Sequence, residues 1–568
     1  MTPRTELLFD PLLRAGDMAQ ILWRAAAVGC ILALCGCAFG GRAVAALKTG
    51  KRVGRLVKFL SSDAAFCTLV AFTILLLRIP CLTLPQCNVD EAQWIAGANT
   101  LWDDPRFWGS VDGITSGPLV IYPLLSAKMF GSTIDYLSAR CLAHVLWAAI
   151  GIFTYLTFRL VSSAFAARIL SLPLATAVAL FSNCEFVGYN GEHVPIFMLS
   201  VAFWLAASVL IREVPRPWQL VLLGVSLGSI PYSKLQAVPM GLAIGCVTLI
   251  WTAKWKNKAV LVASAAAPTA LVFCYLVSFR LVHDFWYSYI LSNLNYAVGV
   301  SQVTPLKRVV RLPFFLFDSE DTRYFFLVQC LATVPVPALI LLRWRLLDRI
   351  GRRVLFLAAS YLFGSFYGVL QPGTFNGHYF LFLIHPMVLA SGMSIVLLAK
   401  NGTTAVDGSR QPVWAAVFLA AMVIGPAGRV VTVGNAALKN MGQRKDIMES
   451  SPVAGAIMQI RTEASSLAVW GWAPHYYVQT GMKQAARDAH TLYEITEGRY
   501  QSYYTERFVN DLAAKKQVIF VDATKSVDSK YFNDERFRHE NYPTVAEMVR
   551  SRFRFIAEYR GSRIYISK

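Results

Sequence analysis

Hydrophobic runs recur along most of the chain and are separated by short polar stretches. About twelve of them reach the roughly 17–25 residues that a helix needs to cross a bilayer core. They fall near residues 20–41, 64–80, 139–160, 167–183, 194–211, 217–233, 237–252, 259–281, 324–343, 353–370, 379–399 and 412–432. The pattern predicts an all-α polytopic membrane domain of about 11–12 transmembrane helices.

The first run has a second interpretation. Residues 21–41 combine a charged flank, an apolar stretch and the small residues of Leu34-Cys35-Gly36-Cys37, which also suit a cleaved signal sequence. Both alternatives stay open, and we expect a retained span or an interfacial helix.

Composition agrees with a membrane protein, since the 568 residues are 55% hydrophobic and 15% charged. The net charge of +20 does not indicate nucleic-acid binding, because the basic residues are spread over loops and form no single basic face. Basic stretches at 42–58, 254–258 and 343–353 mark the cytoplasmic side. The loops 81–138, 184–193, 282–322 and 371–378 are then expected outside.

After the last run the chain becomes polar and highly charged. Strand-like runs at 467–472, 517–522, 553–559 and 563–567 alternate with helical stretches at 505–516 and 545–551. The sequence thus predicts three parts: an N-terminal extra helix with a basic cytoplasmic loop (1–60), a transmembrane catalytic domain (61–433) and an extracytoplasmic α/β domain (434–568).

Two adjacent carboxylates, Asp90 and Glu91, lie just after the second run in the first long outer loop. Asn88 and Glu91 have the N-x-x-E spacing of a helix capping box, and acids are favourable in the first turn of a helix. That interpretation explains Glu91 and leaves Asp90 free. An acid so close to the membrane is otherwise a functional residue, and Asp90 suits a general base that takes a proton from an acceptor hydroxyl or amine.

Such a base needs an electrophile. The outer compartment offers no nucleotide sugars, and the chain has neither G-x-G-x-x-G nor the P-loop pattern. A lipid-linked phosphate ester fits better, and it requires cations that stabilise the leaving phosphate. Lys234 and Arg140 lie at outer ends of runs and are candidates, although either side chain can instead anchor its helix at the membrane surface.

Further polar residues share the predicted outer side. Lys307, Arg308 and Arg311 break the positive-inside pattern, and they either hold lipid phosphates or are simply solvated. Glu192, His193 and His378 suit helix capping and substrate hydrogen bonding.

The sequence also offers candidate residues for a metal site and for a disulfide. Glu192, His193 and His378 together with Asp90 also offer ligands for a divalent cation, but no spacing enforces such a site, so no metal or other cofactor is assigned. Cys81 and Cys87 are candidates for a short disulfide if the compartment is oxidising.

Several of these motifs occur in the order of a known family. The segments are Asp90-Glu91, Ser116-Gly117-Pro118-Leu119 with Tyr122-Pro123, Ala139-Arg140, Ser233-Lys234-Leu235-Gln236, His378-Tyr379 and Trp470-Gly471-Trp472. From about residue 60 onward the chain resembles the GT-C glycosyltransferases, and among them the branch of protein O-mannosyltransferases and lipid A aminoarabinose transferases.

The resemblance implies an inverting transfer of a sugar from a polyprenyl-phosphate donor to a lipid, glycan or protein acceptor, on the outer face of a bacterial inner membrane. Asp90 is then the acidic residue that acts as base or orients the acceptor, and Glu91 is its catalytic partner. The expected phosphate contacts are Lys234, Arg140, Lys307, Arg308 and Arg311; the expected substrate contacts are Glu192, His193, Gln236, His378 and Tyr379. The family usually has a lysine before Pro-Pro-Leu, and here Ser116-Gly117 stands instead, so no cation is assigned at that position.

A transporter or lipid flippase is the alternative function, because many spans with isolated charges also suit alternating access. That class typically has inverted repeats and charged residues near the centres of its spans. Neither is visible in this sequence, where the ionisable groups gather at the outer ends of the runs. The sequence therefore favours a membrane glycosyltransferase.

Overall fold

A computed structural model describes residues 18–38, 62–82, 84, 86–212, 214–299, 303–320, 322–342, 344–401, 428, 434, 435, 438, 451–527, 529 and 531–568. Apart from residue 428, the run predicted at 412–432 lies outside the described residues, as do residues 60 and 433 at the proposed domain boundaries. Those boundaries stay predictions.

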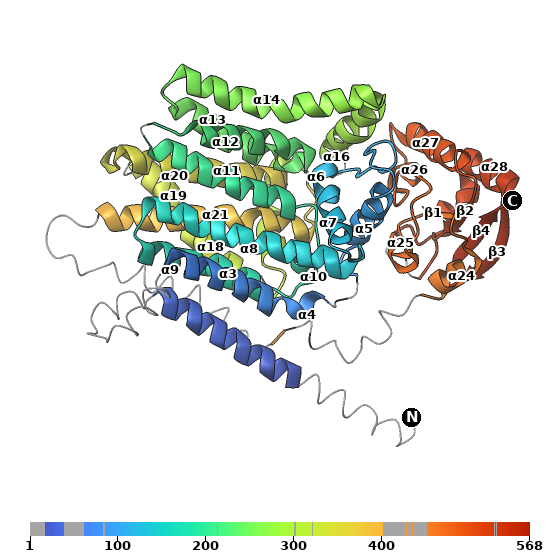
Figure 1. Ribbon diagram of the computed structural model, residues 1–568, viewed down its shortest axis with the longest axis horizontal. Coiled ribbons are helices and arrows are strands. Elements are labelled where there is room, and N and C mark those ends of the chain that lie inside the picture. Colours follow the sequence, from blue (N-terminus) through green and yellow to red (C-terminus); the bar gives the residue numbers. More distant parts are fainter. Residues whose placement is uncertain are drawn as a thin grey trace.

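The larger part of the protein is a bundle of apolar helices (Figure 1). Six described helices are long and apolar enough to cross a membrane: Met18–Ala38, α8 (Tyr136–Val161), α11 (His193–Ile211), α14 (Trp255–Ser278), α20 (Arg349–Leu370) and Gly377–Leu398, which joins η6 (Gly377–Phe380) to α21 (Leu381–Asn401). The other runs form shorter helices: α3 (Asp63–Leu77), α9 (Ala164–Leu180), α12 (Pro217–Ser229), α13 (Val238–Trp251), α18 (Arg323–Thr333) and α19 (Pro335–Leu342). By length and composition the chain is an integral membrane protein, as predicted.

The run at 324–343 was expected to form one helix, and the structure divides it. The helix α18 ends at Thr333 and α19 begins at Pro335. Proline lacks the N–H that would continue the helical hydrogen-bond ladder, so a break at this position has a direct cause.

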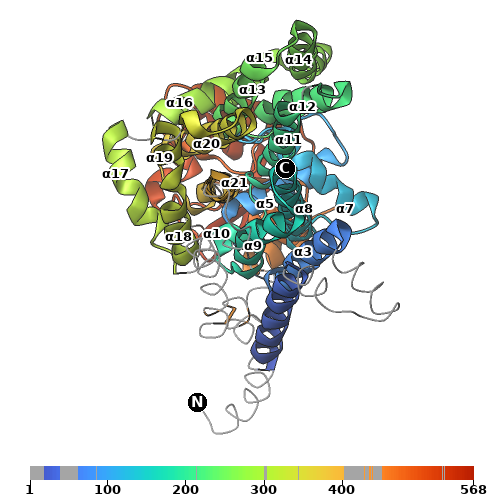
Figure 2. The same cartoon turned by 90° about the vertical axis from the view of Figure 1, so that its left-hand side faces the viewer.

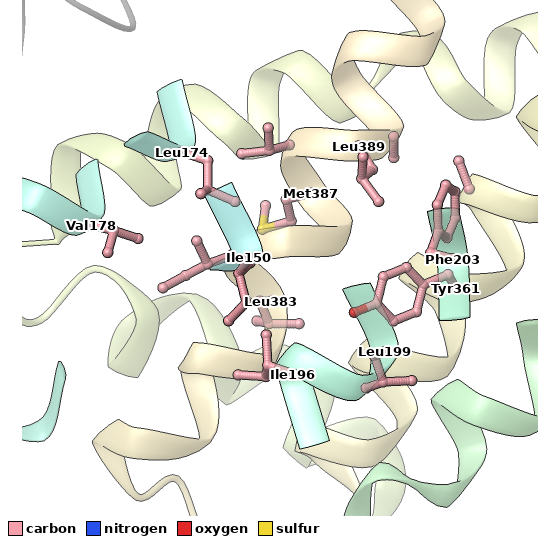
Figure 3. Packing of buried hydrophobic residues seen from close by; sticks show 14 of the residues in the cluster. Ile150, Leu174, Val178, Ile196, Leu199, Phe203, Tyr361, Leu383, Met387 and Leu389 are labelled. Carbon is pink, nitrogen blue, oxygen red and sulfur yellow. The ribbon is translucent and has the colours of Figure 1, made fainter. Parts of the chain in front are cut away.

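The helix α21 runs through the middle of the bundle (Figure 2) and packs against α8, α9, α11 and α20. Leu383 on α21 belongs to one buried cluster with Ile150, Leu174, Ile196 and Tyr361 from these four neighbours (Figure 3), and each of the five side chains is at most 1% exposed. Close packing of this kind, rather than exclusion of water, is what holds helices together in lipid.

A layer of short helices lies between the bundle and the C-terminal domain (Figure 1). It contains α5 (Val89–Leu101), α6 (Pro118–Ile121), α7 (Ser126–Met129) and α10 (Cys184–Val187). The helix α5 begins next to the end of the bundle and carries the acidic pair in its first turn.

The C-terminal domain has a four-stranded sheet with the order β1-β2-β4-β3. The strand β1 (Ser466–Trp470) is parallel to β2 (Val518–Asp522), whereas β4 (Ser562–Ser567) is antiparallel to both β2 and β3 (Phe553–Tyr559). The helices α24 (Pro452–Ile460), α25 (His475–Thr480), α26 (Leu492–Ile495), α27 (Gln501–Ala513) and α28 (Pro543–Arg552) pack around the sheet. The predicted α/β unit and its four strands are confirmed.

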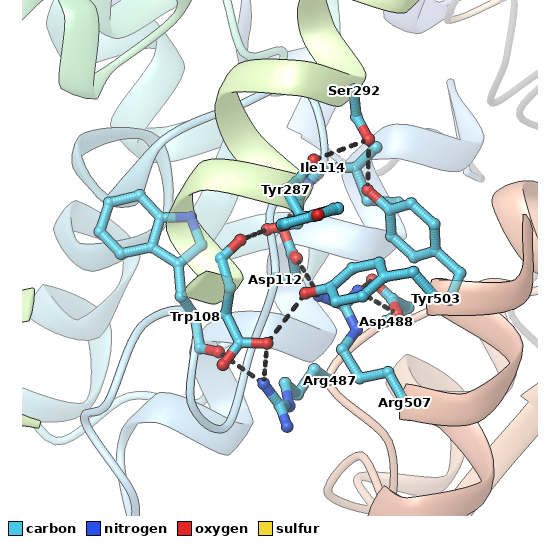
Figure 4. A network of polar contacts seen from close by, with 12 residues as sticks. Trp108, Asp112, Ile114, Tyr287, Ser292, Arg487, Asp488, Tyr503 and Arg507 are labelled. Atoms are coloured by element: carbon cyan, nitrogen blue, oxygen red, sulfur yellow. Dashed lines mark hydrogen bonds and ion pairs between the residues drawn. The ribbon is translucent and has the colours of Figure 1, made fainter. Parts of the chain in front are cut away.

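Buried ion pairs join this domain to the loop that follows α5 (Figure 4). Arg507 on α27 donates to Asp112 in the loop at 2.8 Å and to Asp488 of its own domain at 2.6 Å, and all three side chains are at most 3% exposed. Close by, Arg487 pairs with Asp284 of the membrane part at 2.9 Å. The C-terminal domain is thereby held against the segment that carries the acidic pair.

Candidate active site

Asp90 lies in the first turn of α5, where its backbone N–H donates to the side-chain oxygen of Asn88 at 3.0 Å. Among the described residues, none forms a hydrogen bond or ion pair with the Asp90 carboxylate. Burial raises the pKa of Asp90 above its ordinary value, while the charges of His378 and Lys234 act in the opposite direction. The site thus holds a carboxylate with increased proton affinity and an unoccupied hydrogen-bonding capacity, which are properties of a general base.

Glu91 has a different environment. Its two oxygens accept from Arg140 at 2.8 and 2.7 Å, and neither side chain of this pair is exposed. The same carboxylate accepts the backbone N–H of Tyr189 at 2.9 Å and that of Cys87 at 3.4 Å. The predicted capping box is therefore wrong in its second half: Asn88 caps α5, but Glu91 binds Arg140 and neighbouring amides instead of returning to Asn88.

Arg140 was expected to contact the donor phosphate. Besides Glu91, its guanidinium donates to the backbone carbonyls of Cys81, Leu82 and Leu84. With no exposed side-chain surface, Arg140 ties α8 to α5 and to the segment before it. Its observed contacts are those of a residue that fixes the acidic pair in place.

Lys234 lies between the end of α12 and the start of α13, and its ammonium is bonded to the Glu192 carboxylate. It also lies 5.2 Å from the centre of the Tyr379 ring. Backbone pairing brings Lys234 to the outer loop, since Ser116 and Lys234 form an isolated bridge and the Gly117 N–H donates to the Ser233 carbonyl at 2.8 Å. The segment that packs against Lys234 is thus the one in which Ser116-Gly117 differs from the pattern of the family that the sequence resembles.

Steric crowding explains why residue 117 is a glycine. A Cβ at this position would lie only 2.3 Å from the Tyr232 carbonyl oxygen. The family's larger residue therefore does not fit this close approach of the two backbones.

His378 is a third polar residue of the site, beside Asp90 and Lys234. Its Nδ1 lies 2.8 Å from the Glu185 carboxylate, and the Asn88 side-chain amide donates to that carboxylate at 3.2 Å. Asn88 thus caps α5 and also connects it to α10 and η6. Glu185 was missed from the sequence, although an isolated acid in the short outer loop between two runs was a signal that could have identified it.

His193 contacts Tyr189 and Asn190. Its ring is parallel to that of Tyr189 at 5.9 Å, and its Nδ1 accepts the backbone N–H of Asn190 at 3.0 Å. Both rings are completely buried. These contacts are structural, and they place His193 in the protein interior beside the site.

The three outer basic residues lie on α17 (Pro305–Leu316). Arg308 donates to the backbone carbonyls of Val303, Leu370 and Gln371, whereas Lys307 and Arg311 are exposed. Arg308 therefore secures α17 to the end of α20.

A cavity of about 310 Å³ opens beside Lys234. Its walls are mainly apolar and come from α13, α16 (Ser292–Gly299), α20 and η6, and its polar members include Gln236, Gln371 and Tyr379. Gln236 donates to the Gly368 carbonyl at 3.0 Å, and the Tyr379 hydroxyl lies 3.2 Å from that of Tyr296. Lys234 thus has an anionic partner in Glu192 and also lines an apolar cavity.

Solved structures share this architecture. ArnT from Cupriavidus metallidurans bound to undecaprenyl phosphate superposes with a TM-score of 0.55 at 14% identity, over 90% of this chain and 98% of that one. Its apo form gives 0.54 at 13%, over 91% and 98%. The chain has a GT-C fold.

Other comparisons add less. The oligosaccharyltransferase AglB from Archaeoglobus fulgidus, in complex with an inhibitory peptide and a dolichol-phosphate, matches with a TM-score of 0.44 at 12% identity, over 89% of this chain and 74% of that one. No protein-family model matches the chain, and no curated protein matches it in sequence.

Within the described part of this GT-C fold, one group of three potential metal ligands converges, and it lies in the C-terminal domain: Asp522, His539 and Glu540. Asp522 and His539 already bond to each other at 2.6 Å. The ligands considered from the sequence, namely Asp90, Glu192, His193 and His378, do not form such a group.

The disulfide considered from the sequence is not formed. Neither Cys81 nor Cys87 takes part in a disulfide bond. The Cys87 thiol is hydrogen-bonded to Cys184 instead, so the segment before α5 contacts the start of α10.

Proposed function

We propose that this GT-C chain is a glycosyltransferase that moves a sugar from a polyprenyl-phosphate donor to a lipid, glycan or protein acceptor on the outer face of the membrane, with inversion at the anomeric carbon. The observation that carries the proposal is the convergence of Asp90 and Lys234 on one site, although 144 residues separate the two in sequence. Asn88, which caps the helix at Asp90, lies 3.2 Å from His378, and Lys234 lies 5.2 Å from the ring of the next residue, Tyr379. The charge of Lys234 accordingly acts on the Asp90 carboxylate.

The cavity beside Lys234 supports the choice of donor. Its volume of about 310 Å³ and its apolar walls suit the first isoprene units of a polyprenol, and a lysine at its end suits the phosphate that follows them. ArnT, whose fold is similar, was solved with undecaprenyl phosphate bound. The cavity and Lys234 thus support a choice of lipid phosphate in the donor, and they do not bear on the choice of sugar.

In the proposed reaction the acceptor hydroxyl or amine attacks the anomeric carbon from the face opposite the phosphate. Asp90 takes the proton that the acceptor loses, and the sugar–phosphate bond breaks with its electron pair remaining on the phosphate. Lys234 stabilises the charge that develops on the leaving oxygen. The pair of Glu91 and Arg140 positions the first turn of α5, and His378 with Glu185 holds Asn88 at its cap.

The test uses the full-length protein in liposomes with a polyprenyl-phosphate sugar and an extract of envelope acceptors, with glycans measured by mass spectrometry. Asp90→Asn is expected to abolish transfer without loss of folded protein, because the amide cannot accept the proton. Asp104→Asn is the matched control, since Asp104 lies just after the other end of α5 and pairs with Arg106 at the surface.

Retained transfer by Asp90→Asn would refute the role of Asp90 as the base. Movement of the lipid across the bilayer without any sugar transfer would favour the transporter function instead.

A further inference from the structure

Lys234 has an anionic partner within the protein. Its ammonium is bonded to Glu192, the residue before α11, and their side chains are 8% and 0% exposed. The other oxygen of Glu192 is buried and has no hydrogen-bond partner among the described residues. The cation that the proposed function requires for the donor is therefore already paired with a carboxylate of the protein.

A phosphate and Glu192 compete for this ammonium. Lys234 has only three N–H groups, and it also lines the apolar cavity, whose walls do not include Glu192. An incoming phosphate would lie close to the Glu192 carboxylate, and two like charges at such a distance repel strongly where little water screens them. Separating a buried ion pair is unfavourable because it leaves a charge without compensation. Lys234 can therefore release Glu192 only if the phosphate takes the place of Glu192.

We propose that Glu192 is an exchangeable counter-ion of Lys234: it holds the ammonium in the empty enzyme, yields it to the donor phosphate, and recaptures it when the spent polyprenyl phosphate leaves. This inference rests on the proposed function and adds to it a residue that sets how tightly the lipid phosphate is held. As a consequence of this exchange, the product binds weakly. The product is a phosphomonoester with more negative charge than the phosphodiester of the donor, and without Glu192 it would remain bound to Lys234.

The exchange also connects donor binding to the base. Lys234 and Glu192 act on Asp90 with opposite signs. A phosphate bound at Lys234 cancels the charge that favours the ionised form of Asp90, while the Glu192 carboxylate stays nearby. The proton affinity of Asp90 is then greatest when a donor is present to be used.

The experiment measures binding of undecaprenyl monophosphate to the full-length protein in nanodiscs by native mass spectrometry. Glu192→Gln keeps the shape of the side chain and removes its charge, and we expect it to bind the lipid phosphate at least about tenfold more tightly than the wild type. Lys234→Gln is expected to weaken binding by a similar factor. Undecaprenol, which has the same tail and no phosphate, is expected to bind the wild type and Glu192→Gln equally.

Two further variants separate contact from general charge. Glu185→Gln removes an acid from the same site that bonds to His378 and not to Lys234, so its effect is expected to be much smaller than that of Glu192→Gln. Glu192→Asp keeps the charge but shortens the reach by one methylene, and an affinity between those of the wild type and Glu192→Gln is expected. Thermal melting of each variant confirms that it is folded.

Unchanged or weaker binding of the lipid phosphate by folded Glu192→Gln, with Lys234→Gln impaired, would overturn the counter-ion role and leave the proposed function intact. An equal effect of Glu185→Gln would also overturn it, because the charge and not the contact would then matter. Failure of the wild type to bind the lipid phosphate at all would contradict the proposed function itself.

Discussion

Replacing Glu91 by Gln tests whether the second acid of the pair is a structural residue. Arg140 would keep its charge with no exposed surface, and its bidentate bond to Glu91 would be lost. Breaking a buried ion pair by removing one partner typically costs about 3–5 kcal/mol, because the remaining charge is left without compensation. The free energy of unfolding should fall by about that amount.

The assay is a double-mutant cycle with Glu91→Gln, Arg140→Met and the combined variant, measured by equilibrium unfolding in mixed micelles. Because the combined variant has no stranded charge, it should recover part of the loss and give a coupling energy of about 2 kcal/mol. Transfer activity should follow the folded fraction. A Glu91→Gln protein as stable as the wild type but inactive would refute this reasoning and make Glu91 a participant in the chemistry.

Two further predictions concern the C-terminal domain and the bundle. Burial raises the pKa of Asp488 from 3.8 to about 6, with Arg507 opposing the shift and Asp112 adding to it, so the contribution of Asp488 to the stability of the folded protein is greatest below about pH 4 and falls as the pH rises from about 4 to 6. Melting curves from pH 4 to 8 should show this decline, and Asp488→Asn should flatten it. In the bundle, a Cβ on Gly228 would lie 2.0 Å from the Ala265 carbonyl oxygen, so Gly228→Ala should force α12 and α14 apart and lower the melting temperature, whereas an unchanged value would contradict the close packing.

Much of the fold was predictable because it depends on local patterns. The runs at 139–160, 194–211 and 353–370 correspond to α8, α11 and α20, and the four predicted strands of the tail overlap β1 to β4. Period and length decide such elements without knowledge of distant contacts. The break at Pro335 was missed, because the apolar composition continues across it while the backbone does not.

The residues of the site could be predicted from the sequence, but the partner that each side chain binds could not. Asp90, Glu192, Lys234 and His378 do gather on one side of the bundle, but the partners of each side chain come from other elements. Arg140 lies 49 residues from Glu91, and His378 lies 193 residues from Glu185. Tertiary packing sets such contacts, so the sequence alone could not assign Arg140 to Glu91 or Glu192 to Lys234.

The most direct test of the proposed function is an experimental structure of the full-length protein in nanodiscs with undecaprenyl phosphate. We predict that the phosphate lies within hydrogen-bonding distance of the Lys234 ammonium, that the tail enters the cavity lined by Gln236 and Tyr379, and that the Asp90 carboxylate faces the same space. A phosphate bound instead at the exposed Lys307 and Arg311, with the cavity empty, would contradict it.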